Sequence, residues 1–178
     1  MIHHNSAPGR FAKATAWLNC TDCPTGYDQN MTKQDACEQC LPGEFANETG
    51  RPVCTLCFMG RYSDEEAAVT DETCIHCELG FYLDERGRTK VPDENYPTLR
   101  QMRKSPCQSC SKGRYNDWLG GTTFQLACIL CPNGTYAETE ANDDRSDCMD
   151  CKTGRYSDEL GMVMNRAEED EYKFVDSW

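Results

Sequence analysis

Cysteine is the residue type whose number and spacing in this sequence could support chemistry. All 14 cysteines fall into seven Cys-x-x-Cys pairs, which begin at Cys20, Cys37, Cys54, Cys74, Cys107, Cys128 and Cys148. Two such pairs can bind one zinc ion, a single reactive pair can exchange disulfides, and pairs in an oxidising compartment can form structural cross-links. The residues around the pairs distinguish these three kinds of chemistry.

Zinc binding is disfavoured by the number of pairs and by the residues after them. An odd number of pairs cannot be divided into four-cysteine sites, and the same residue types come after every pair, whereas a zinc ribbon treats its two knuckles differently. Glycosylation sequons along the chain also favour export over an intracellular zinc protein. We therefore expect no metal ligand and no cofactor, and we retain zinc binding as a third hypothesis for the function.

Catalytic chemistry is also disfavoured. A thioredoxin-like site needs one reactive pair at the start of a helix, and this chain has seven pairs without a helical pattern. Of the three histidines, His3 and His4 lie near the N-terminus and His76 lies between Cys74 and Cys77. Because no candidate nucleophile has a base that would be oriented beside it, we predict no catalytic residue and no enzyme activity.

The residues that position each cysteine pair form a fixed pattern. A glycine is the third residue after the second cysteine in all seven units. An aromatic residue comes two positions after that glycine in six units, whereas Tyr27 directly follows Gly26, which makes the first unit one residue short. We expect the glycine to adopt a positive φ in a turn, and the aromatic ring to pack on a neighbouring disulfide.

The composition requires cross-links, because Leu, Ile, Val and Phe number only 24 of 178 residues and the formal net charge is −12. Such a chain buries too little apolar surface to offset its conformational entropy. A disulfide that closes a loop of ~15 residues contributes roughly 3 kcal/mol in the chain-entropy model. The predicted fold class is small and disulfide-rich: an elongated tandem array of short β-ribbon and loop repeats with little helix and no central core. We expect no helix within the repeats.

The chain divides into three expected segments. Residues 1–19 form a leader without a repeat signature, from which Phe11 and Trp17 could dock on the first repeat. Residues 20–161 contain the seven repeats, and residues 162–178 form an acidic, solvated tail without cysteine.

A longer loop at residues 83–106 interrupts the array and is rich in basic residues. It is either a simple exposed loop or a contact site for an acidic patch on another molecule, and Arg100, Arg103 and Lys104 are the candidate contact residues.

The cysteines can be paired in two ways. We favour serial pairing, in which the second cysteine of each unit joins the first of the next: Cys23–Cys37, Cys40–Cys54, Cys57–Cys74, Cys77–Cys107, Cys110–Cys128 and Cys131–Cys148. Interlocked pairing, such as Cys20–Cys37 with Cys23–Cys40, remains open, because connectivity does not follow from sequence alone. Serial pairing leaves Cys20 and Cys151 unpaired or linked outward, as expected if a longer array continues at both ends.

Several features indicate an extracellular or cell-surface location. N-glycosylation sequons occur at Asn19, Asn30, Asn47 and Asn133, and disulfides persist in oxidising compartments. No signal-peptide core and no run of ~20 apolar residues is visible, so we expect an export leader elsewhere and no membrane insertion in this segment. The acidic pI of about 4.6 disfavours nucleic acid as a partner.

The repeated unit resembles a known family. The segment CTLCFMGRYSDE from Cys54 to Glu65 recurs as CMDCKTGRYSDE from Cys148 to Glu159, and this pattern is similar to the ephrin-receptor-like cysteine-rich repeat. The segment CEQCLPGEF from Cys37 to Phe45 also resembles the opening of tumour-necrosis-factor-receptor modules. The resemblance covers residues 20–161 and implies an elongated rod in which each unit touches only its neighbours.

The sequence supports two functional hypotheses. The first is a non-enzymatic structural or adhesive protein, a rod-like module of a surface appendage, filament or matrix, as in flagellar hairs. The alternative is a ligand-binding segment of a receptor ectodomain. Both predict other protein chains as partners, copies of the chain itself in a polymer among them, together with N-linked glycans.

Overall fold

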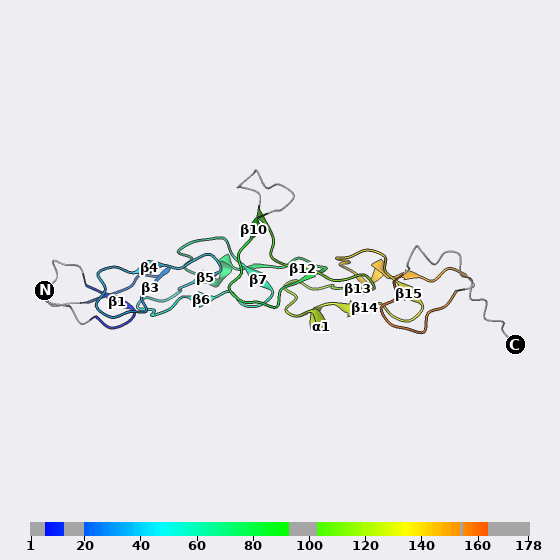
Figure 1. The fold of residues 1–178 in the computed structure, drawn as a ribbon, viewed down its shortest axis with the longest axis horizontal. Coiled ribbons are helices and arrows are strands. Elements are labelled where there is room, and N and C mark those ends of the chain that lie inside the picture. Colours follow the sequence, from blue (N-terminus) through cyan, green and yellow to red (C-terminus); the bar gives the residue numbers. More distant parts are fainter. Residues whose placement is uncertain (1–5, 13–19, 93–102, 154, 164–178) are drawn as a thin grey trace.

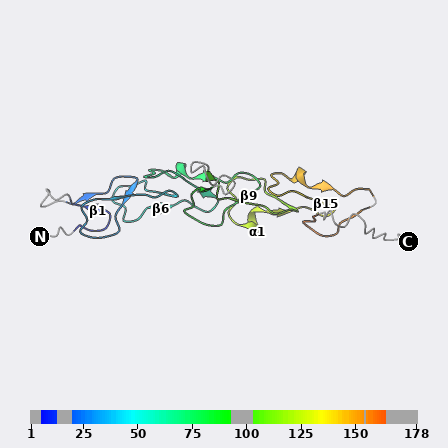
Figure 2. The ribbon, with the colours of Figure 1, turned by 45° about the horizontal axis from the view of Figure 1, so that its top comes forward.

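The structure is a computed structural model that describes residues 6–12, 20–92, 103–153 and 155–163. The described chain forms an elongated rod in which short two-stranded sheets succeed one another along the long axis (Figure 1). A view turned by 45° shows the same arrangement (Figure 2). Six disulfides cross-link the rod, and helix is confined to short turns, so the predicted fold class is confirmed.

The sheets of the described chain are all antiparallel pairs of two-residue strands. They join β1 (Arg10–Phe11) to β2 (Thr21–Asp22), β3 (Tyr27–Asp28) to β4 (Glu38–Gln39), β5 (Glu44–Phe45) to β6 (Thr55–Leu56), β7 (Arg61–Tyr62) to β8 (Ile75–His76), β9 (Phe81–Tyr82) to β12 (Gln108–Ser109), β10 (Val91–Pro92) to β11 (Arg103–Lys104), β13 (Arg114–Tyr115) to β14 (Ile129–Leu130), and β15 (Thr135–Tyr136) to β16 (Met149–Asp150). Apart from β10–β11, each sheet pairs the residues that follow a glycine with the two residues between the cysteines of the next unit.

We number the units 1 to 7 from their first cysteines, beginning at Cys20, and call the glycine after each pair the turn glycine. The turn glycines from Gly26 to Gly134 all have a positive φ, between 76° and 89°, as the sequence predicted. The amide of each second cysteine donates a hydrogen bond of 2.8–2.9 Å to the turn-glycine carbonyl of the preceding unit, as in Cys40 to Gly26 and Cys57 to Gly43. This bond recurs along the whole rod and links each unit to the next.

A second left-handed turn, which the sequence pattern did not reveal, lies seven residues after each turn glycine. Its residues are Lys33, Gly50, Ala67, Gly87, Gly120, Ala141 and Gly161, with φ between 50° and 72°. Their amides donate to the carbonyls of residues at the second-cysteine position of the preceding unit over 2.8–3.1 Å. Each step from unit 1 to unit 7 is therefore held by repeated backbone hydrogen bonds as well as by a disulfide.

The described part of the leader contains half of an additional unit, so the prediction that residues 1–19 lack the repeat is wrong. Gly9 has a φ of 80° and its carbonyl accepts the amide of Cys23, as every later turn glycine does for the next unit. Ser6 takes the second-cysteine position, because its carbonyl accepts the amide of Lys33. Phe11, which we expected to dock on the first repeat, lies in β1 and pairs with β2, whereas Trp17 lies outside the described residues.

Unit 1 has full length, which corrects the expectation that it is one residue short. Strands β3 and β5 each begin directly after a turn glycine. Tyr27 therefore corresponds to Glu44, and Asp28 takes the place of the aromatic Phe45. The Asp28 carboxylate accepts the amide of Cys54 over 2.9 Å. A hydrogen bond therefore replaces the usual aromatic contact at this disulfide.

Short helices occur within the repeats, where we expected none. They are η1 (Asp71–Thr73), α1 (Phe124–Ala127) and η2 (Arg145–Asp147), and each ends directly before the first cysteine of a unit. The preceding units are three or four residues longer than the 17-residue spacing at the start of the array. One helical turn takes up these extra residues while the cysteines keep their places.

The buried residues form separate small clusters, each built around a disulfide. Phe45 packs with Cys57, Cys74 and Ala68, and Tyr115 packs in the same way with the Cys131–Cys148 bridge. Within the described residues the aromatic ring of one unit thus covers the next disulfide along the rod. This matches the predicted contact and the predicted lack of one central core.

The units contact more than their immediate neighbours, which corrects the expectation drawn from the family resemblance. A Cβ atom placed on Gly26 would lie 2.3 Å from the carbonyl oxygen of Ala67, two units further on. A Cβ atom on Gly60 would lie 2.2 Å from the carbonyl oxygen of Gly120. Gly26 and Gly60 are therefore required for close backbone packing between alternate units, in addition to their φ.

Candidate functional site

The cysteines form six disulfides with the serial connectivity, which are Cys23–Cys37, Cys40–Cys54, Cys57–Cys74, Cys77–Cys107, Cys110–Cys128 and Cys131–Cys148. The Cα atoms of each pair lie 5.4–5.9 Å apart. Within the described residues Cys20 and Cys151 have no disulfide partner, and both are half-buried. Serial pairing would join Cys20 to the position that Ser6 occupies, so a serine stands where the bridge would form.

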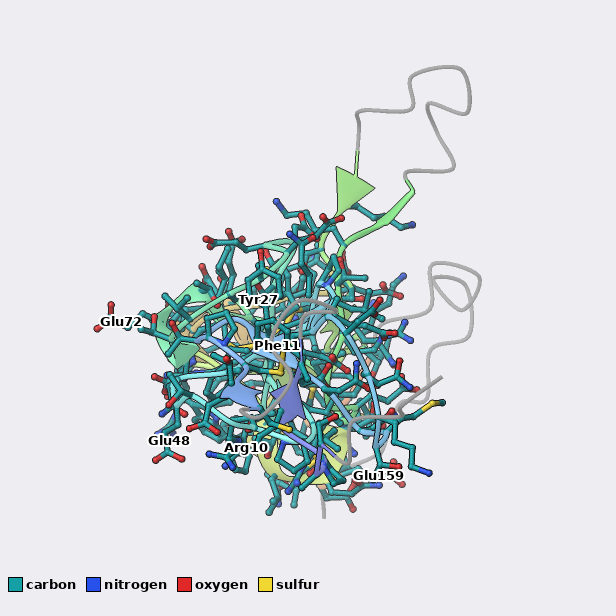
Figure 3. All side chains as sticks on the ribbon, turned by 90° about the vertical axis from the view of Figure 1, so that its left-hand side faces the viewer. Arg10, Phe11, Tyr27, Glu48, Glu72 and Glu159 are labelled. Atoms are coloured by element: carbon teal, nitrogen blue, oxygen red, sulfur yellow. A yellow bond between two sulfur atoms is a disulfide. The ribbon has the colours of Figure 1, made fainter. Side chains whose placement is uncertain are left out.

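The loop predicted at residues 83–106 includes a hairpin that projects from the side of the rod (Figure 1). Its described arms are β10 and β11, which pair Val91 with Lys104 and Pro92 with Arg103. Of the three predicted contact residues, Arg103 and Lys104 form β11, and Arg100 lies outside the described residues. Viewed along the rod, the described arms β10 and β11 point outward from the rod (Figure 3).

The described base of this hairpin is anchored by Asp64. Its carboxylate accepts the Thr89 hydroxyl over 2.6 Å and the Lys90 amide over 2.8 Å, and it lies 3.4 Å from the Lys90 ammonium group. Partial burial by itself would raise the pKa of Asp64, but these hydrogen bonds and the charge of Lys90 outweigh it and hold the pKa below its ordinary value. Asp64 therefore fixes the position from which the hairpin leaves the rod.

Two arginines beside this anchor are already engaged. The guanidinium of Arg86 lies 4.8 Å from the centroid of the Phe58 ring, and Arg88 forms a 3.1 Å ion pair with Glu85. Phe58 remains 60% exposed. Arg88 is therefore paired with an acidic residue of the same loop, whereas Arg86 keeps its positive charge beside an aromatic ring.

A second feature lies in unit 5, and the sequence analysis did not identify it. Phe124 at the start of α1 packs edge-on against Tyr82, with ring centroids 5.6 Å apart, and the Arg114 guanidinium lies 4.6 Å from its centroid. Trp118 and Leu119 are exposed, Leu119 by 61%. Aromatic and aliphatic side chains exposed beside a rigid support are typical of protein contact sites. The signal in the sequence is the apolar pair Trp118-Leu119 at a position that other units fill mostly with polar residues.

His76 takes part in a polar contact across β7 and β8. The Arg61 guanidinium donates to His76 Nε2 from Nε over 3.0 Å and from Nη2 over 2.7 Å, and it lies 3.6 Å from Asp71. An acceptor Nε2 must be unprotonated. Burial and the charge of Arg61 lower the pKa of His76, which favours this neutral form.

The remaining predicted sites are surface positions. Asn30, Asn47 and Asn133 are exposed, whereas Asn19 lies outside the described residues. The described residues contain no group of three or more His, Cys, Asp or Glu side chains that could hold a metal ion. Among the helices of the described chain, none has the length and apolar content needed to cross a membrane.

A comparison with protein families matches part of the chain. Residues 98–148 match the family described as tyrosine-protein kinase ephrin type A/B receptor-like, and the match spans β11 to the first cysteine of unit 7. A comparison with curated proteins found no match. The family match agrees with the resemblance seen in the sequence and favours the receptor-type alternative over the structural or adhesive hypothesis. Together with the disulfides, it points to an extracellular or secreted location.

Proposed function

We propose that this chain, which contains an ephrin-receptor-like cysteine-rich module, is part of an extracellular receptor-type protein that binds another protein through the side of a rigid rod. The observation that carries the proposal is that the segment matching the family exposes apolar side chains on a rigid support. The matched residues 98–148 contain the exposed apolar side chains of Trp118, Leu119 and Leu126. Their support is rigid, because two disulfides and the Phe124 contact hold the surrounding backbone.

The rod supplies rigidity, which lowers the entropy lost when a partner binds. Backbone hydrogen bonds and a disulfide hold each step, so the matched segment is presented in one conformation. The hairpin of β10 and β11 projects from the rod at the start of this segment, which includes β11. We propose it as an additional contact region for an acidic partner, with Arg103 and Lys104 in its second arm.

The proposal assigns no catalytic residue, metal or cofactor. For the absence of catalysis it rests on the sequence. The same Cys-x-x-Cys spacing recurs in every unit, as expected for structural cross-links, and no candidate nucleophile has a base oriented beside it. The partner is a protein chain, because exposed aromatic and aliphatic groups framed by charged residues are typical of protein interfaces. Self-association into a polymer is the competing outcome of the test below.

The test uses the full oxidised chain, immobilised and exposed to a panel of extracellular protein domains, with binding measured by surface plasmon resonance. We expect saturable binding to a discrete partner. Leu119→Ser should then weaken the affinity about tenfold or more, since a central contact contributes more than about 1.4 kcal/mol. Leu160→Ser is the matched control, because Leu160 has the same place in unit 7, is 58% exposed and lies outside the matched segment.

Two results would contradict the proposal. Equal affinities for the two serine variants would remove unit 5 from the binding surface. An absence of saturable binding across the panel, combined with concentration-dependent assembly of the chain into filaments, would instead support the structural hypothesis.

A further inference from the structure

Each unit presents an exposed loop of three residues, which begins four positions after the turn glycine and which we call the outer loop. All three residues are exposed in units 1, 2, 4, 5, 6 and 7, and only the first residue of the unit 3 loop, Asp64, is partly buried. Five units place an acidic residue first: Asp64, Asp84, Asp117, Glu138 and Asp158. Units 1 and 2 instead place Asn30 and Asn47 there, each followed two residues later by threonine. The first position is polar in every unit and is exposed in all units except unit 3.

The two asparagines lie at the centres of their disulfide loops. Asn30 is seven residues from each cysteine of the Cys23–Cys37 bridge, and Asn47 is at the same position in the Cys40–Cys54 loop. Thr32 and Thr49 are exposed as well, so the amide and the hydroxyl of each sequon face solvent. A bulky group on either asparagine would meet no buried surface of the rod.

Asn133 also begins a sequon, but its surroundings differ. It lies two residues after Cys131, in a tight turn in which the amide and the hydroxyl of Thr135 both donate to the Pro132 carbonyl, over 3.1 and 2.7 Å. The middle residue of this sequon is Gly134, whose amide and carbonyl bond to Ser157 and Cys151. The hydroxyl that a glycosyl transferase must engage is therefore held within the turn.

We propose that Asn30 and Asn47 carry N-linked glycans and that Asn133 does not. In the transfer, the side-chain Nδ2 of asparagine forms a bond to the anomeric carbon of an oligosaccharide carried on a lipid pyrophosphate. The bond between that carbon and the pyrophosphate oxygen breaks, the lipid pyrophosphate leaves, and the amide nitrogen gives up one proton. The donor and the transferase are those of the secretory pathway.

These glycans would also limit which part of the rod a protein partner can reach. This consequence rests on the proposed function. Seen along the rod, the side chain of Glu48, which follows Asn47 in the unit 2 outer loop, points outward (Figure 3). A glycan on Asn47 would extend into solvent from this outer loop. Units 1 and 2 would then be shielded, and the matched segment in units 5 and 6 would stay open to a protein partner.

The experiment expresses the full chain behind a secretory leader in eukaryotic cells. The intact mass is measured before and after treatment with peptide N-glycosidase. We expect the number of glycans to fall by one in Asn30→Gln and by one in Asn47→Gln, and to stay unchanged in Asn133→Gln. Thr32→Ala and Thr49→Ala remove the same sequons through a different residue, and should each lose one glycan.

Loss of a glycan in Asn133→Gln, or an unchanged number of glycans in either Asn30→Gln or Asn47→Gln, would overturn the proposal. The number of free thiols, measured in each secreted variant, verifies that the disulfides have formed. The number of glycans on each variant is independent of the proposed function. A chain without these glycans that still binds a partner would overturn only the glycan assignment, and a glycosylated chain without a partner would overturn only the function.

Discussion

Replacement of the turn glycine Gly60 by alanine should destabilise the rod far more than the same replacement at Gly134. The two glycines have nearly the same backbone conformation, with φ of 78° and 81°. Their surroundings differ, because a Cβ atom on Gly60 would lie 2.2 Å from the Gly120 oxygen and 2.7 Å from the Gly120 carbonyl carbon, whereas a Cβ atom on Gly134 would meet nothing within 4 Å. The pair therefore separates the cost of the conformation from the cost of the contact.

The magnitude is the sum of these two costs. A left-handed alanine costs about 1–2 kcal/mol, and the reduced entropy of the unfolded chain returns about 0.4–1 kcal/mol, so Gly134→Ala should lose about 1 kcal/mol. Gly60→Ala carries the same cost and must also displace a backbone carbonyl, and overpacking costs about 1–3 kcal/mol or more. The displacement would strain the hydrogen bonds of Gly60 to Leu83 and Cys77. We expect a total loss of about 2–4 kcal/mol.

The assay is urea unfolding of the oxidised chains, monitored by circular dichroism. Hydrogen exchange at the Cys77 and Gly120 amides would show whether the loss is local, since the stability of a repeat array is close to a sum over its units and interfaces. Equal losses in the two variants, within about 0.5 kcal/mol, would refute the inferred contact between alternate units.

Three further predictions concern other parts of the rod. Ser6→Cys should form a disulfide with Cys20, lower the free-thiol count from two to one and raise the stability by about 3 kcal/mol. A count of three free thiols in this variant would argue against the additional half-unit. Asp64→Asn should release the base of the hairpin at a cost of about 1 kcal/mol, seen as faster exchange of the Lys90 amide, because a neutral amide cannot pair with the lysine. The pKa of His76 is lowered in the folded state, so the unfolded state binds the proton first as the pH falls, and the stability should decrease below about pH 6.5. His76→Gln should remove this part of the pH dependence in thermal melts. An unchanged dependence of the melting temperature on pH would exclude His76 as its source.

The parts of the fold that depend on local chemistry could be predicted from the sequence. The cysteine spacing, the turn glycine and the aromatic residue lie within nine residues, so each unit carries the information for its own hairpin and disulfide contact. The left-handed turn seven residues later was missed because its residue types vary, from Gly50 to Lys33 and Ala67. Backbone hydrogen bonds stabilise that turn, and they do not require a particular side chain.

Contacts over longer distances could not be predicted from the pattern. The approach of Gly60 to Gly120 depends on how the units stack, which the spacing of cysteines does not specify. The half-unit at Ser6 was missed because the repeat was defined by its cysteines. A comparison of SAPGRFA from Ser6 with CLPGEFA from Cys40 would have found it. The apolar pair of unit 5 was missed because its exposure depends on the fold.

The connectivity of the disulfides is the most direct test of the rod architecture, because every step of the rod depends on it. Peptide mapping of the native chain without reduction should recover the six serial links, with Cys20 and Cys151 outside them. Recovery of Cys20 linked to Cys37 together with Cys23 linked to Cys40 would contradict the ladder. Those links would place different units in contact, and neither the proposed binding segment nor the outer loops would keep the positions described.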